Sequence, residues 1–254
     1  MKTESVLSRI NSILAMLEDP TPAKFELEKL GAELADQVRM EYAASRGVTS
    51  ATRIIRAMLK AEQKKCNRPA LQYAWIDGQG RQCVCDGFRA FRLVEALPLE
   101  ERPADAGDPV DLGKVVPVIS KNYAAMPLPG VNEVKAFIAL EQASKGRKVT
   151  PVWDFGKGKP AVNAQYLADL LNVLPDAQEI YYSVDGKFSP LYAKSERGDA
   201  LLLPVSTESK KAEYAAAKHF AALMQNYREC VAKDNNYAIS PDAFALMVKY
   251  APAV

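Results

Sequence analysis

Hydrophobic positions recur at helical spacing through the first 47 residues of the chain. Over residues 3–19 they fall on one side of a helix, which Pro20 and Pro22 interrupt. Pro22 can occupy the first turn of a second helix, which Gly47 ends. The apolar side of this second helix would hold Phe25, Leu27, Leu30, Leu34, Val38 and Tyr42. The pattern predicts two helices that need a partner surface, in their own domain or in another chain.

A third helix and three strands are predicted next. Residues 50–65 have a helical pattern, with Thr49 or Ser50 as the cap. Residues 70–77 and 81–95 are rich in strand-forming residues and are joined by a Gly-rich turn, which indicates a hairpin. Asp86-Gly87 divides the second of these segments.

The same order of elements is predicted again further on. Residues 98–130 are mainly loop with a short apolar piece at 115–119, and a helix over 131–146 follows. A strand over 149–155 precedes a helix over 164–174, capped by Asn163. Three further strands are predicted over 178–184, 189–195 and 199–205, and two helices over 208–234 and 240–250. The order helix–strand–strand–strand, or αβββ, therefore occurs twice, without any repeat of the sequence itself.

Composition limits the classes of function. The chain has 254 residues, a net charge of +2 and an ordinary share of charged residues, so a nucleic-acid role would need local clusters of charge. Apolar runs as long as a membrane span are missing, and the N-terminus has no signal-peptide pattern. Of the 4 cysteines, Cys83 and Cys85 would point the same way from one strand into a core. With a single histidine in the chain, we expect free thiols in the cytoplasm, no metal site and no cofactor.

The helix over 50–65 carries the clearest candidate site. Its four cations lie at helical spacing on one face, opposite the apolar residues, and Glu62 lies on the other side. Such a row could contact the phosphates of a polyanion. A solvated helix face is the alternative. The candidate DNA-binding residues are Arg53, Arg56, Lys60 and Lys64.

Other motifs give no enzyme signature. The Gly-Lys turn at 156–160 lacks the full phosphate-loop pattern, and a cationic turn explains it better. His219 has no nucleophile-elbow motif to accompany it. Residues 83–95 place Phe88, Phe91 and two arginines on one short strand, either as solvated arginines or as part of a nucleic-acid-binding scaffold. We therefore expect no catalytic residues.

Two stretches resemble the bacterial DNA polymerase III beta sliding clamp family. Residues 160–205 have the Asn-containing helix start, the Tyr166-Leu167 helix and the three strands of a clamp domain, with Ser189-Pro190-Leu191 and Leu203-Pro204 at the matching steps. Residues 68–95 look like the hairpin of a clamp domain. The resemblance covers about residues 50–205 and departs from the family in an inserted segment and in the terminal helices.

The resemblance implies an α+β fold with one DNA-clamp-like domain of two αβββ halves. We expect this domain over residues 49–206, with an inserted loop and helix at about 98–146. Helical extensions would occupy residues 1–48 and 207–254. The resemblance also implies a non-enzymatic, DNA-associated factor with a replication accessory or processivity-like role. The alternative is a degenerate clamp-fold module that binds a protein and not DNA.

The implied partners are double-stranded DNA and a polymerase or another replication protein, with no membrane. A bacterial clamp subunit has three such domains, and this chain has room for one. We therefore expect a monomer or dimer, and not a closed ring of six domains.

Overall fold

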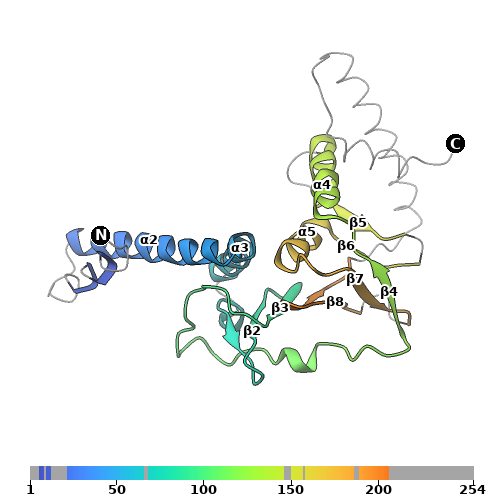
Figure 1. Ribbon diagram of the computed structural model, residues 1–254, viewed down its shortest axis with the longest axis horizontal. Coiled ribbons are helices and arrows are strands. Elements are labelled where there is room, and N and C mark those ends of the chain that lie inside the picture. Colours follow the sequence, from blue (N-terminus) through green and yellow to red (C-terminus); the bar gives the residue numbers. More distant parts are fainter. Residues whose placement is uncertain are drawn as a thin grey trace, which may run out of the picture.

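The computed structural model describes residues 6–8, 10–12, 22–65, 68–145, 150–156, 158–185 and 189–205 (Figure 1). Residues 6–8 and 10–12 are helical, and α2 (Pro22–Ser45) begins at Pro22 as predicted. After α2 the chain turns at Gly47, whose φ of +67° favours glycine, and enters α3 (Thr49–Lys65). The predicted helices over 208–234 and 240–250, with His219 and Cys230, lie outside the described residues.

One antiparallel sheet of seven strands organises the fold. Its order is β1-β2-β3-β9-β8-β7-β4, and β3 pairs with β9 so that Phe91 lies opposite Ala200. The strands are β1 (Trp75–Ile76), β2 (Gln82–Cys85), β3 (Arg89–Leu93), β4 (Tyr123–Pro127), β7 (Glu179–Ser183), β8 (Leu191–Ser195) and β9 (Gly198–Leu202). β5 (Val152–Asp154) and β6 (Ala161–Asn163) form a separate pair. This mixture of helices and antiparallel sheet confirms the α+β class.

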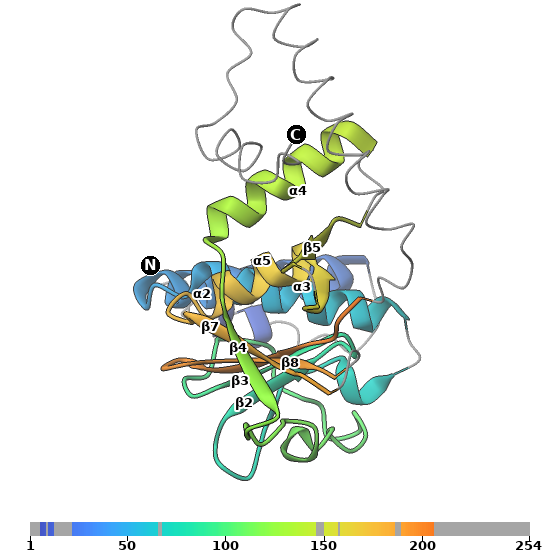
Figure 2. The same ribbon diagram turned by 90° about the vertical axis from the view of Figure 1, so that its right-hand side faces the viewer.

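Helices cover one face of the seven-stranded sheet. α3 packs against α5 (Ala164–Val173), and both lie over the same face (Figure 2). Side chains alternate along the strands, so Phe91 and Leu202 pack under the helices with Ile55 and Leu167. α4 (Val131–Lys145) packs on α5 and stands farther from the sheet.

The long connection between β3 and β4 covers the other face of the sheet. It contains the 3-10 helix η2 (Leu112–Lys114), whose Leu112 is buried in a second cluster. Trp75, Cys83, Ala90, Tyr192 and Leu201 complete that cluster. Both faces of the sheet are therefore covered by parts of the same chain.

Several predicted boundaries were wrong. The 3-10 helix η1 (Pro69–Leu71) occupies the start of the first predicted strand, which shortens β1 to two residues. β4 lies within the segment predicted as loop, and β6 was not predicted. The short apolar piece at 115–119 joins no strand, and Val118 in it is 86% exposed. Among the described residues, no helix has the length and apolar character to cross a membrane.

Candidate nucleic-acid interface on α3

α3 has one buried side and one cationic side. Ile55, Met58 and Leu59 are buried against the sheet and α5, in agreement with the predicted apolar face. Thr52 is buried on the same side, and its hydroxyl donates a hydrogen bond to the carbonyl of Val48 at 2.9 Å. The polar side chain is thereby satisfied within the helix.

The four predicted DNA-binding residues differ in their surroundings. Arg53, Lys60 and Lys64 are exposed, whereas Arg56 is partly buried, with 14% of its side chain exposed. Arg56 forms an ion pair with Asp36, which α2 brings to the row. The row itself contains no acid, but a second helix, α2, supplies one to it.

The ion pair also affects the titration of Asp36. Burial alone raises the pKa of this carboxyl group, but the hydrogen bond and charge of Arg56, together with Lys60 and Arg39, leave the pKa below its ordinary value. Asp36 is thus held in its charged form beside α3, and part of the positive charge of the row is neutralised inside the protein.

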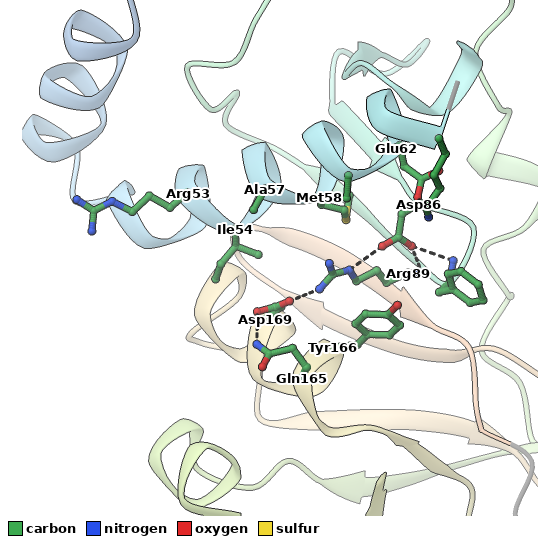
Figure 3. Close-up of a pocket in the computed structure, with 13 residues that line it drawn as sticks. Arg53, Ile54, Ala57, Met58, Glu62, Asp86, Arg89, Gln165, Tyr166 and Asp169 are labelled. Carbon is green, nitrogen blue, oxygen red and sulfur yellow. Dashed lines mark hydrogen bonds and ion pairs between the residues drawn. The ribbon is translucent and has the colours of Figure 1, made fainter. Parts of the chain in front are cut away.

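β3 holds its two arginines inside the molecule, and it contains Phe91, whereas Phe88 precedes the strand in the turn after β2. Arg89 donates from Nε to Asp86 at 2.9 Å and pairs through Nη1 with Asp169 of α5 (Figure 3). Arg92, on the opposite face of β3, makes two hydrogen bonds to Asp199 at 2.7 and 2.6 Å. The interpretation as solvated arginines was wrong, since both side chains are buried in ion pairs.

A pocket of about 400 Å³ lies between α3, α5 and the turn that joins β2 to β3. Ile54, Ala57 and Met58 of α3 form its apolar wall. The aromatic rings of Phe88 and Tyr166 lie 6.2 Å apart on the other side. Sequence reasoning missed this pocket, because α3 and α5 are about a hundred residues apart in the chain.

Cys83 and Cys85 are the two cysteines that the structure describes. Cys83 is fully buried, and Cys85 is partly buried in the same cluster, as their spacing predicted. Burial raises the pKa of the Cys83 thiol to about 12. Among the residues that the structure describes, no group of three or more His, Cys, Asp or Glu side chains could hold a metal ion.

Comparison with solved structures gives a partial likeness to two proteins. The beta subunit of DNA polymerase III from Thermotoga maritima shares 16% identity, with a TM-score of 0.29. The beta chain of DNA polymerase III from Streptococcus pneumoniae shares 13% identity, with a TM-score of 0.27. Each match covers 50% of this chain and 41% of the other. No model of a known protein family matches the chain, and no curated protein matches it. At these TM-scores the likeness does not assign the chain to a family.

Proposed function

We propose that this protein is a non-enzymatic, DNA-associated factor with one clamp-like domain, whose α3 helix faces the DNA. One observation carries the proposal: α3 and α5 lie side by side on one face of the sheet, with Arg53, Lys60 and Lys64 exposed on α3. A duplex approaching this helix would meet several cations within about three turns, and phosphates would offset their mutual repulsion.

The strand order supports two αβββ halves within this domain. α3 is followed by β1, β2 and β3, and α5 is followed by β7, β8 and β9. The two sets of strands meet where β3 pairs with β9, and β4 adds to the outer edge beside β7. A single domain of this kind cannot encircle a duplex. We therefore propose that the protein acts as a monomer or dimer beside a polymerase or another replication protein. Light scattering would measure the oligomeric state.

DNA binding by α3 is testable through its salt dependence. Fluorescence anisotropy of a labelled duplex should give sequence-independent binding, with a slope of log K against log salt of about −3 to −4 for three or four phosphate contacts. Arg53→Ala combined with Lys60→Ala should reduce that slope by about two, because both side chains are exposed. The matched control is Lys121→Ala with Lys194→Ala, two exposed lysines away from α3, which should leave the slope unchanged.

A stability control separates lost contacts from a lost fold. Ile55 is fully buried in the core, so Ile55→Ala should lower the free energy of unfolding by about 2–5 kcal/mol. The Arg53 and Lys60 variant should not. If the protein fails to bind duplex DNA at low salt, or if the double variant binds with an unchanged slope, the row is a solvated helix face.

A second candidate function is a protein-binding module that does not bind DNA. Two observations favour it: Arg56 is held by Asp36, and α2 exposes large apolar side chains. Phe25 is 67% exposed, and Leu30 and Tyr42 are 44% and 53% exposed. A negative result in the DNA assay would place this function first.

A further inference from the structure

The pocket between α3 and α5 has one aromatic ring that remains open to a ligand. Phe88 and Tyr166 both line the pocket, and their ring centres lie 6.2 Å apart. The guanidinium group of Arg89 lies 4.4 Å from the centre of the Tyr166 ring and engages one of its faces. Phe88 is 48% exposed. The Phe88 ring is therefore the aromatic surface that a group entering the pocket would meet.

The backbone holds Phe88 in this position. Its amide donates a hydrogen bond to Oδ1 of Asp86 at 2.9 Å, and its carbonyl accepts one from the amide of Leu203 at 2.8 Å. Gly87 before it has a φ of +85°, which favours glycine. A ring held in advance loses little conformational freedom when a ligand binds, so more of the contact energy appears as affinity.

The charges that line the pocket balance, so they favour an uncharged group. Three carboxylates and three cations line it. Two of the cations, Arg89 and Lys65, pair with all three carboxylates. Ile54, Ala57 and Met58 add an apolar wall. A flat, neutral group with an apolar face fits this lining, whereas a charged group would lose its hydration there without a free partner of opposite charge.

The third cation, Arg53, connects the pocket to the cationic row of α3. Arg53 is exposed, and Figure 3 shows its side chain directed away from the other labelled residues of the pocket. Lys60 and Lys64 are exposed farther along the same helix. Phosphates attached to a group in the pocket would therefore meet cations beside the pocket and not inside it.

We propose that the pocket binds an unpaired base of single-stranded DNA next to a duplex. The base stacks on Phe88, and its backbone continues along Arg53 and the exposed lysines of α3. A base inside a duplex is paired and stacked, so only an unpaired base offers its face to the ring. Stacking on an aromatic side chain accepts any base, because every base has such a face. The inference rests on the proposed function, since the cations of α3 hold the DNA beside the pocket.

Two DNA probes that differ only in their bases test the proposal. Fluorescence anisotropy with the full-length protein would compare a duplex that has an overhang of about six thymidines with the same duplex whose overhang is abasic. Both overhangs carry the same phosphates, so a difference in affinity reports the bases. The thymidine overhang should bind about tenfold more tightly, the scale of one stacked base.

Variants of Phe88 connect that ratio of affinities to the ring. Phe88→Ala should reduce the ratio to about one, and Phe88→Leu, which keeps an apolar side chain without a ring, should do nearly the same. Phe88→Trp should preserve the ratio. The matched control is Phe25→Ala, which removes a 67% exposed phenylalanine from α2 and should leave the ratio unchanged. Thermal denaturation would show that each variant folds.

The Phe88→Trp variant also reports the contact directly. The 2 tryptophans of the chain, Trp75 and Trp153, are only 6% and 3% exposed. The added indole would lie at the open side of the pocket, where a base can stack on it. The thymidine overhang should therefore quench its fluorescence, and the abasic overhang should not.

Three outcomes would overturn the proposal. The first is equal binding of the two overhangs by the wild-type protein, and the second is a ratio that Phe88→Ala leaves unchanged. The third is a ratio lost in Phe88→Ala but kept in Phe88→Leu, which would favour a pocket for an apolar side chain of a partner protein.

The salt dependence of binding to a blunt duplex keeps this inference apart from the proposed function. Equal binding of the two overhangs, together with the expected slope for the blunt duplex, would end this inference alone. A ratio that depends on Phe88, together with a slope that Arg53→Ala and Lys60→Ala leave unchanged, would end only the proposed role of the row. Absence of all DNA binding would overturn both.

Discussion

At the scale of single residues, the buried ion pairs of β3 decide what its arginines can do. Arg89 and Arg92 point to opposite faces of the sheet, and each pairs with a carboxylate from another element. A buried charge that loses its partner destabilises a protein strongly, so such pairs are held in place. Tyr192 also donates to Asp199 at 3.3 Å, which ties β8 into the same group. Arg89 connects the sheet to α5, Arg92 connects β3 to β9 within the sheet, and neither guanidinium is available to a phosphate.

Burial has a chemical consequence at Cys83. The thiol is fully buried, and its pKa is raised to about 12. Because the thiolate is the reactive form, iodoacetamide should label Cys83 slowly in the native protein at mildly alkaline pH and quickly in guanidinium chloride. Peptide mapping by mass spectrometry would measure both rates. Equal labelling in the two conditions would show that the second cluster opens readily.

The same raised pKa gives stability a definite pH dependence. Below the ordinary thiol pKa of 9.0, the folded and unfolded states both keep the proton. As pH rises from 9.0 toward about 12, the unfolded state releases the proton first, so the free energy of unfolding falls. Cys83→Ser would replace the thiol by a group without this titration and should reduce the loss. Denaturation curves across this range would measure it.

At the scale of elements, local chemistry predicted most helices and strands. Asn163 caps α5 as expected, since its side chain accepts from the amide of Gln165 at 2.9 Å. The buried and exposed faces of α3 were also predictable, because its apolar residues recur at helical spacing on one face and its cationic residues on the other. The turn at Glu196-Arg197 separates β8 from β9, within one residue of the break that the sequence indicated.

Elements that depend on distant partners were not predictable. β4 contains two alanines and a proline, which have little strand propensity, and it forms by pairing with β7 more than fifty residues later. The ion pair between Asp36 and Arg56 was not predictable for a similar reason, because it joins side chains of two different helices. The pocket beside Glu62 likewise exists only when α3 and α5 come together. Local patterns do not encode any of these contacts.

The junction of β3 and β9 depends on a glycine. Gly198 has a φ of +145°, and a Cβ atom there would lie 2.1 Å from the carbonyl oxygen of Arg92. Gly198→Ala should therefore force the central strands apart and lower the free energy of unfolding by at least about 1–3 kcal/mol. Gly78→Ala is the matched control, because no atom lies within 4 Å of its Cβ position. Chemical denaturation would compare them, and equal stability of the two variants would contradict the role of this close approach.

At the scale of the whole molecule, the net charge of +2 means that any attraction to DNA must come from one surface. In the proposed function the exposed cations of α3 would provide that surface, and α2 limits their number by placing Asp36 beside Arg56. The docking of α2 on α3 thus fixes how many cations a duplex could meet. The effect of the Asp36–Arg56 ion pair on DNA binding can be tested by removing the charge of Asp36.

Asp36→Asn should release Arg56 while keeping the shape of the side chain. If α3 faces DNA, the slope of log K against log salt should become steeper by about one, and affinity at low salt should rise. The fold should persist, because 36% of the Asp36 side chain is exposed and such pairs contribute at most about 1 kcal/mol. Asp77→Asn removes an acid that pairs with Arg81 away from α3, so it makes the same change in net charge and should leave the slope unchanged. Anisotropy titrations over a range of salt would measure all three proteins. A slope that changes equally in both variants would mean that overall charge, and not the row on α3, governs the binding.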